Sequence, residues 1–207
     1  MAPTLQKSQL LLVDALTRES FDFQALPLPD LELLIRVARR GRVLGRLHAL
    51  LQKSGRLEGL PSTAADHFRA ARVQTDHMGR RALWELDRVG WAAGAELEGA
   101  VALKGCGYAL AGLELAEGRY LSDVDLLLSP SRLERVEKTL RGRGWSLVKQ
   151  SEYDQRYYRD WSHEIPPLSH PERGVEVDLH HNILPPTSRL RPDSGLLLEA
   201  RRRVADS

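Results

Sequence analysis

The sequence predicts an α+β fold in which a helical N-terminal portion packs on a mixed sheet. Up to about residue 98, apolar residues recur at three- and four-residue steps, which is the period of an amphipathic helix. Beyond Ala100, short apolar runs and period-two alternation take over, and both are typical of strands. The change of period therefore separates a helical N-terminal region, 1–98, from a strand-containing core, 99–190. Residues 191–207 form a tail or the start of a further helix.

Three helices are predicted in the N-terminal region, over 5–20, 31–54 and 61–97. Asp30 is placed to cap the second helix, because aspartate accepts hydrogen bonds from the free amides of a first helical turn. Gly41 and Gly45 either weaken that helix or allow close packing inside it. The third is a long amphipathic helix that leads directly into a strand at Val101.

The core region alternates short strands with helices. Pro130 marks the start of one helix, because proline is favoured at the first helical position. The predicted helices cover 106–115 and 131–141, and the predicted strands cover 101–103, 123–128, 145–149, 153–158, 163–168 and 174–183. The second and the last of these strands carry the polar residues on which the functional interpretation depends.

Asp123 and Asp125 lie two positions apart in a strand, so both carboxylates project to the same face. Two adjacent carboxylates repel each other, and an apolar strand is a costly place to collect them. A divalent cation, Mg²⁺ or Mn²⁺, removes that cost and usually brings nucleotide phosphates with it. A strand end where two aspartates simply face water is the alternative, and the short Asp-x-Asp pattern alone leaves it open.

A phosphate site is predicted just upstream of the aspartates. The apolar run from Val101 ends in Lys104-Gly105, and a short helix follows. A glycine turn at a helix N-terminus offers backbone amides and the helix dipole to an anion. Lys104 and, downstream, Arg119 add positive charge for the same ligand.

A third carboxylate is available on a later strand. Glu176, Asp178 and His180 alternate with apolar residues, so they share one face of that strand. If this strand lies beside the Asp123–Asp125 strand, Asp178 completes a three-carboxylate metal site, and Glu176 is the reserve candidate. Alternation also fits a face that is merely exposed to solvent.

These motifs resemble the nucleotidyltransferase superfamily that includes DNA polymerase β. Within it, the chain is most similar to the uncharacterised bacterial nucleotidyltransferases often written as NTP-transferase family 5. The resemblance covers roughly residues 60–190 and rests on several motifs in order: Leu103-Lys104-Gly105, Arg119, Ser122–Leu127, the segment from Ser162-His163 to Leu168, and Val177–His180. The chain departs from the superfamily at Cys106, where a glycine or serine usually follows the first glycine. The Lys-Gly and Arg-x-x-Ser-Asp-x-Asp motifs are also similar to the AbiEii toxin-type nucleotidyltransferases.

The resemblance implies a polymerase β-like mixed sheet and an enzyme of the nucleotidyltransferase class. Such an enzyme moves a nucleoside monophosphate from an NTP, for example ATP, to an acceptor hydroxyl and releases pyrophosphate. The implied catalytic and metal-binding residues are Asp123, Asp125 and Asp178, with Mg²⁺ or Mn²⁺ as the cofactor. The implied nucleotide-binding residues are Lys104, Gly105 and Ser122 on phosphate oxygens, and Arg119 on the leaving pyrophosphate or in support of the loop.

Composition is that of an ordinary globular chain. Of 207 residues, 42% are hydrophobic and 28% charged, which excludes disordered and fibrous classes. The single cysteine permits no internal disulfide, so a reducing cytoplasm is the simplest compartment, and no signal peptide or membrane span is predicted. The net charge of +2 favours reading the arginine-rich helical segments as solvated faces rather than as an RNA-binding surface.

Several alternatives stay open at this point. The acceptor is a protein, a peptide, an RNA or a small molecule, and the chain is also compatible with a non-catalytic nucleotide sensor or a toxin-like enzyme that modifies tRNA. Four histidines cluster late in the chain, but their spacing fits no strong zinc signature and no cysteines support it. His180 is expected instead to orient a carboxylate or the acceptor. The four are His163, His170, His180 and His181.

Overall fold

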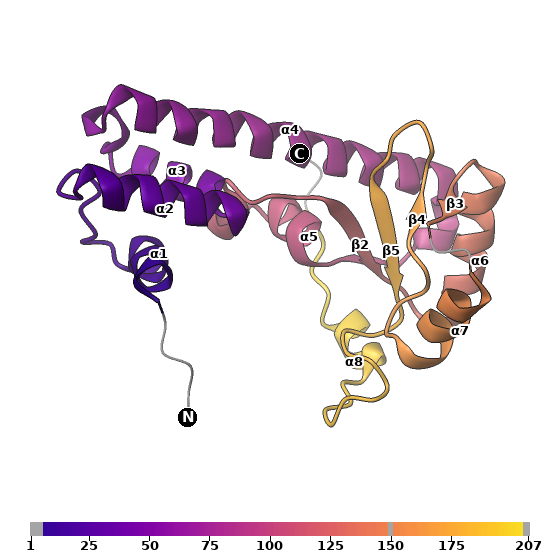
Figure 1. Ribbon diagram of the computed structural model, residues 1–207. Helices are drawn as coiled ribbons and strands as arrows, with labels where there is room; N and C mark the ends of the chain where they lie inside the picture. The colour runs from indigo at the N-terminus through magenta and orange to yellow at the C-terminus, as the bar shows by residue number, and fades with distance from the viewer. Residues whose placement is uncertain (1–5, 149–150, 205–207) are drawn as a thin grey trace. The chain divides into compact units, whose positions relative to one another are not determined.

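The α+β class is confirmed by the computed structural model, which describes residues 6–148 and 151–204 (Figure 1). The helices of this part of the chain are α1 (Lys7–Thr17), α2 (Leu28–Arg40), α3 (Leu44–Lys53), α4 (Ser62–Ala93), α5 (Lys104–Leu110), α6 (Pro130–Gly142), α7 (Glu152–Trp161) and α8 (Ser194–Glu199). The strands are β1 (Val101–Ala102), β2 (Asp123–Leu127), β3 (Ser146–Leu147), β4 (Leu168–Ser169) and β5 (Glu176–His180). Short 3₁₀ turns occur at Leu57–Gly59 (η1), Gly94–Leu97 (η2) and Glu114–Ala116 (η3). Within the described residues, no helix combines the length and the apolar character needed to cross a membrane.

The chain separates into two compact units, and the division falls inside α4. The first unit contains residues 1–79 and 114–120, and the second contains 80–113 and 121–207. The residues of 114–120 therefore join the N-terminal helices although they lie between elements of the second unit.

The first unit is built from α1, α2, α3 and the start of α4 around its own apolar core. Leu34, Leu47 and Phe68 from three of these helices are fully buried there. The segment 114–120 is attached through Glu114, whose Oε1 accepts a hydrogen bond from Lys53 Nζ at 2.8 Å.

The predicted single helix over 31–54 is wrong, because the chain turns between α2 and α3. Arg42 adopts the left-handed conformation, with φ of 57°. The amide of Val43 then donates to the carbonyl of Ala38 at 2.9 Å, which is the closing bond of a Schellman-type helix end. Gly41 supplied the sequence signal, and it marks a helix end rather than a packing site.

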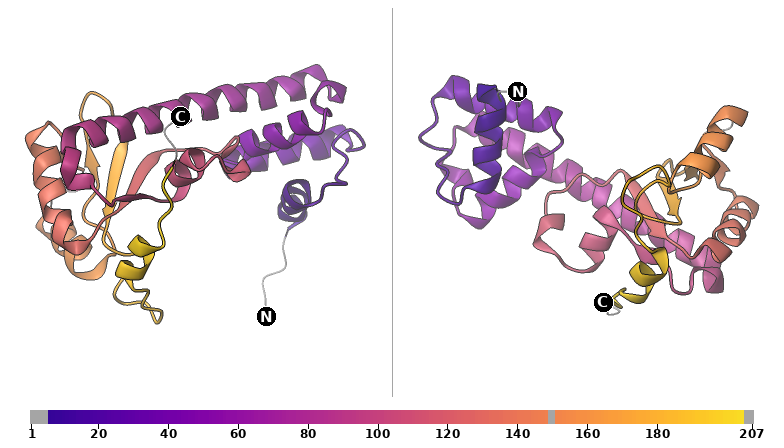
Figure 2. Two further views of the ribbon diagram at one scale, coloured as in Figure 1. Left: turned by 180° about the vertical axis from the view of Figure 1, so that it is seen from behind. Right: turned by 90° about the horizontal axis from the view of Figure 1, so that it is seen from below.

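The second unit contains a mixed sheet with strand order β1-β2-β5-β4-β3 among the described residues. Figure 1 labels β2, β5, β4 and β3, and Figure 2 shows the same unit from behind and from below. Strands β2 and β5 are parallel, and the other neighbours are antiparallel. Apolar residues of β2 and β5 cover one face together with α6 and the C-terminal part of α4. This core includes Val89, Val124, Val136, Leu140, Val177 and Leu179, all fully buried. The side chains that alternate with them, those of the predicted site, lie on the opposite face.

The predicted strand over 153–158 is also wrong, because these residues form α7. Ser151 caps this helix by accepting a hydrogen bond from the amide of Asp154 at 3.0 Å. Arg159 then pairs with the buried Glu137 of α6 at 2.8 Å. The β-propensity of the tyrosines suggested a strand, whereas the Ser-x-x-Asp cap decides the local structure. Residues 149 and 150 of the strand predicted over 145–149 lie outside the described residues.

Gly107 is required where α5 passes close to β1. A Cβ atom built on it would lie 2.4 Å from the carbonyl oxygen of Ala102, which is backbone and cannot move aside alone. We expect Gly107→Ala to lower the free energy of unfolding by about 1–3 kcal/mol through this overpacking. Urea denaturation followed by circular dichroism measures the change. Gly90→Ala is the matched control, since a Cβ there meets nothing within 4 Å and alanine favours α4; equal losses in the two variants would contradict the packing argument.

Candidate active site

The parallel pairing of β2 with β5 builds the site. Their register places Asp125 opposite Asp178 and Leu127 opposite His180. Because residues at alternate positions share a face, the two carboxylates and the imidazole face the same side of the sheet. Ligand atoms of Asp125, Asp178 and His180 all lie within 4.8 Å of one another.

Asp125 is the most buried carboxylate of the group, with 2% of its surface exposed. Its Oδ1 accepts hydrogen bonds from Lys104 Nζ at 2.5 Å and from His180 Nε2 at 2.9 Å. Burial alone would raise the pKa of Asp125, but these two hydrogen bonds and the lysine charge outweigh it and lower that pKa. Asp125 is therefore an ionised carboxylate held between two nitrogen donors.

Lys104 reaches Asp125 from an unusual backbone position. It is the first residue of α5 and has a left-handed φ of 45°. The amide of Leu103 still donates to the carbonyl of Asp125 at 2.9 Å, so β1 stays hydrogen-bonded to β2 up to the turn. A left-handed conformation costs a non-glycine residue about 1–3 kcal/mol, and such strain collects at functional positions. Burial of Lys104 opposes its charge, yet the hydrogen bond and charge of Asp125 leave its pKa raised.

Asp178 lacks the partners that Asp125 has. Its Oδ1 is buried and makes no hydrogen bond with any described residue. Burial, followed by the negative charges of Glu164, Asp125 and Asp123, raises the pKa of Asp178 to about 7. A buried carboxylate oxygen without a hydrogen-bond donor is an atom to which a cation could bind.

Asp123 lies on the same face of β2 as Asp125 but outside the close group. Among the described residues, its carboxylate is not one of those with ligand atoms within 4.8 Å of Asp125 and Asp178. It is half-buried, and its Oδ1 accepts a hydrogen bond from Ser122 Oγ at 3.4 Å. The structure thus brings two of the three predicted carboxylates together and places the third at the start of the strand. Glu176, the reserve candidate, is exposed and pairs in register with Asp123.

Comparison with protein families identifies the family of the chain. Residues 27–206 match the family model described as "Uncharacterised nucleotidyltransferase". The chain belongs to this nucleotidyltransferase family. The family predicted from the motifs is therefore confirmed, and the match extends beyond the predicted range of 60–190 at both ends. Comparisons with curated proteins and with solved structures found no match.

Membership supports nucleotidyl transfer as the general activity of this nucleotidyltransferase, with a nucleotide as substrate. Nucleotidyltransferases generally use divalent metal ions, and the neighbouring carboxylates of Asp125 and Asp178 offer the oxygen ligands that such ions take. The remaining predicted nucleotide-binding residues differ in their placement. Gly105 is the second residue of α5, and Ser122 is exposed directly before β2. Arg119 belongs to the first unit, and its role in the nucleotidyltransferase stays a prediction.

Cys106 is a packing residue of the nucleotidyltransferase. It is buried, and its thiol donates a weak hydrogen bond to the carbonyl of Asp123 at 3.6 Å. Burial, with smaller effects of Asp125 and Asp123, raises its pKa to about 12. Since the thiolate is the reactive form, the thiol is inert at neutral pH.

Sequence reasoning missed Glu164. Its Oε2 lies 3.3 Å from His180 Nδ1, and its charge contributes to the raised pKa of Asp178. The segment from Ser162-His163 to Leu168 was part of the family resemblance, so its position in the sequence gave a signal. The strand predicted over 163–168 is largely wrong, because only Leu168 belongs to β4 and Glu164 forms an isolated bridge with His180. A strand period therefore could not show where the Glu164 side chain lies.

Proposed function

We propose that this protein is a metal-dependent enzyme that transfers a nucleoside monophosphate from an NTP to an acceptor hydroxyl and releases pyrophosphate. The observation that carries the proposal is the close Asp125–Asp178 pair, in which the buried Oδ1 of Asp178 has no partner among the described residues. A pair of hard carboxylate oxygens fits Mg²⁺ or Mn²⁺. Asp125 and Asp178 would hold the metal, with Asp123 from the start of β2.

When bound, a divalent ion at this position neutralises triphosphate charge and lowers the pKa of an acceptor hydroxyl. The residues of the chain supply the other parts. Asp178, which holds the metal through Oδ1, also helps to remove the proton of the acceptor hydroxyl through its other carboxylate oxygen. Lys104 gives up its hydrogen bond to Asp125 and binds a phosphate oxygen instead. Its side chain is 52% exposed, so a nucleotide can reach it. Gly105 and Ser122 bind phosphate oxygens, and Arg119 balances charge on pyrophosphate or supports the loop.

The test combines substrate and acceptor searches. The protein is incubated with each α-phosphate-labelled NTP, Mg²⁺ and a cell lysate, and labelled protein, RNA and small-molecule fractions are separated. We expect one fraction to acquire label only with Mg²⁺ or Mn²⁺, with matching release of pyrophosphate. Binding of an NTP without label transfer would favour the nucleotide sensor instead, and label confined to tRNA would favour the toxin-like alternative.

Metal binding should depend on pH through Asp178. Its folded pKa of about 7 lies above the ordinary aspartate pKa of 3.8, so its contribution to stability is fully present below about pH 4 and is lost as pH rises towards 7. Above pH 7 the ionised group attracts a cation, and below it a proton competes. We therefore expect Mg²⁺ to raise the melting temperature more at pH 8 than at pH 6 in a thermal-shift assay. Asp178→Asn should lose this difference, and a wild-type shift equal at both pH values would contradict the role of Asp178.

A further inference from the structure

A second group of metal-ligand side chains lies beside the carboxylate pair. His163, Glu164 and His180 have ligand atoms within 4.8 Å of one another. Glu164 Oε2 is 3.3 Å from His180 Nδ1 and 4.0 Å from His163 Nε2. Two ligands on one tetrahedral ion, each 2.0–2.1 Å from it, are about 3.4 Å apart. The separation of Glu164 from His180 matches that value, and the separation of Glu164 from His163 is longer.

The orientation of His180 is fixed by Asp125. The ionised carboxylate only accepts hydrogen bonds, so the proton lies on His180 Nε2, and in the neutral ring Nδ1 keeps a lone pair. This Nδ1 is buried and has no hydrogen-bond partner among the described residues, although Glu164 is near. The side chain of His180 is 1% exposed, so the lone pair cannot be satisfied by bulk water. A carboxylate behind an imidazole whose other nitrogen is free is the usual outer support of a histidine metal ligand.

Backbone pairing holds the other two ligands in place. Glu164 forms a bridge with His180, and the amide of His181 donates to the carbonyl of His163 at 2.9 Å. His163 directs Nε2 towards Glu164, while its Nδ1 is a buried nitrogen without a partner in the described part of the chain. The unpartnered Nδ1 of His180, Nε2 of His163 and one carboxylate therefore lie together on a segment that the sheet anchors.

We propose that His163, Glu164 and His180 form a metal site distinct from the Asp125–Asp178 pair, and that it takes a borderline transition-metal ion such as Zn²⁺. Two imidazoles and one carboxylate suit Zn²⁺ and leave a fourth position open, whereas Mg²⁺ prefers oxygen ligands. The sequence predicted no zinc site because the histidine spacing fits no signature and no motif pointed to Glu164 as a ligand. The other clustered histidines have different partners: His170 packs edge-on against Trp145, and His181 Nε2 lies 3.2 Å from the carbonyl of Ser162.

Cobalt substitution tests the proposal directly. One equivalent of Co²⁺ added to the metal-free full chain should give visible absorption of a nitrogen- and oxygen-bound ion, and Zn²⁺ should displace it. In Zn²⁺ titrations with a competing chelator, His163→Ala and Glu164→Gln should each weaken binding by at least about 100-fold, since even outer-shell changes at such sites cost 10–100-fold. Circular dichroism checks that both variants fold. Glu164→Gln keeps the side-chain volume, so it tests the site alone if His163→Ala fails to fold.

Two variants act as controls for location. His77→Ala removes an exposed histidine of α4 and should leave Zn²⁺ affinity unchanged. Asp178→Asn removes a carboxylate of the proposed Mg²⁺ site and should also leave it unchanged within about threefold. The proposal is overturned if the wild type gives no Co²⁺ absorption, if folded Glu164→Gln binds Zn²⁺ like the wild type, or if Asp178→Asn loses Zn²⁺ as His163→Ala does. Because these readouts need no nucleotide, they can fail while Mg²⁺-dependent transfer persists, and the reverse.

Discussion

Asp125→Asn is expected to lower nucleotidyl transfer by at least about 1,000-fold, which corresponds to a loss of about 4 kcal/mol of transition-state stabilisation. An asparagine amide can accept hydrogen bonds from Lys104 and His180, so the fold and the local contacts should survive. It carries no charge to hold a divalent ion against the triphosphate. Label transfer from the preferred NTP, measured with Mg²⁺ at saturating nucleotide, gives the ratio.

Glu176→Gln is the matched control for this variant. Glu176 lies on the same face of β5 as Asp178 but is exposed, so its loss should change the rate less than about twofold. An active Asp125→Asn enzyme, or an inactive Glu176→Gln enzyme, would show that the β2–β5 pair is not the catalytic centre.

Asp123→Asn is also expected to abolish transfer and the thermal stabilisation by Mg²⁺, because we expect the bound metal to draw Asp123 towards the pair.

The sequence could predict which residues share a face of β2 and which share a face of β5, but not that the two strands are neighbours in the sheet. Period-two alternation places Asp123 with Asp125 and Asp178 with His180. It does not show that the two strands are adjacent, because their pairing joins positions 53 residues apart and is decided by the packing of the whole sheet. The family resemblance supplied that step. The alternation also gives no distances, so it missed that Asp123 stays apart from the pair.

Contacts between non-adjacent elements were the least predictable part of the site. Lys104 was assigned to phosphate from its position before a helix, and its hydrogen bond to Asp125 depends on a left-handed turn that lysine rarely adopts. Glu164 lies in an irregular segment, where neither helix nor strand period identifies a face. In both cases the contact is decided by the tertiary structure, and local propensity does not predict it.

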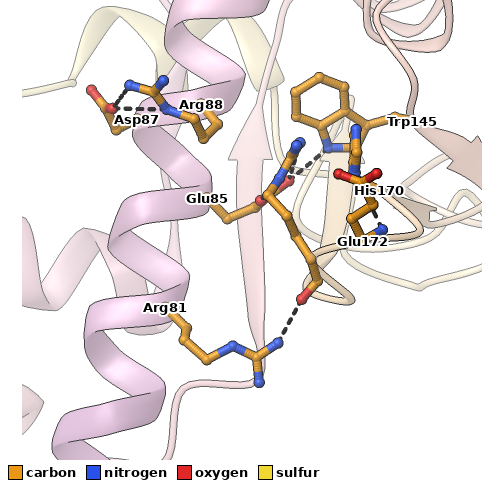
Figure 3. A network of polar contacts seen from close by, with 8 residues as sticks. Arg81, Glu85, Asp87, Arg88, Trp145, His170 and Glu172 are labelled. Atoms are coloured by element: carbon orange, nitrogen blue, oxygen red, sulfur yellow. Dashed lines mark hydrogen bonds and ion pairs between the residues drawn. The ribbon is translucent and has the colours of Figure 1, made fainter.

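A buried ion pair links α4 to the far part of the sheet unit. Glu85 is fully buried, and its carboxylate accepts hydrogen bonds from Trp145 Nε1 at 2.8 Å and from Arg173 Nε at 2.6 Å. The Arg173 guanidinium also lies 4.3 Å from the centre of the Trp145 ring. Figure 3 shows Glu85 and Trp145 facing each other, with His170 beside Trp145 and Arg81 one turn earlier on α4. Since Arg173 lies in the turn before β5, the pair steadies the strand that carries Asp178.

Glu85→Ala should therefore lower the free energy of unfolding by about 3–5 kcal/mol, because it leaves a largely buried arginine and an indole N–H without an acceptor. Urea unfolding followed by circular dichroism gives the total loss of stability, and hydrogen exchange at the β5 amides reports on this unit separately.

Asp87→Asn is the matched control. It removes one partner of the exposed Asp87–Arg88 pair on the same helix and should cost less than about 0.5 kcal/mol. Glu85→Met combined with Arg173→Met should recover much of the loss, since an apolar pair removes both the orphaned charge and its partner. A Glu85→Ala protein as stable as Asp87→Asn would mean that water or a rearranged Arg173 replaces the carboxylate, and that the position of β5 does not depend on this ion pair.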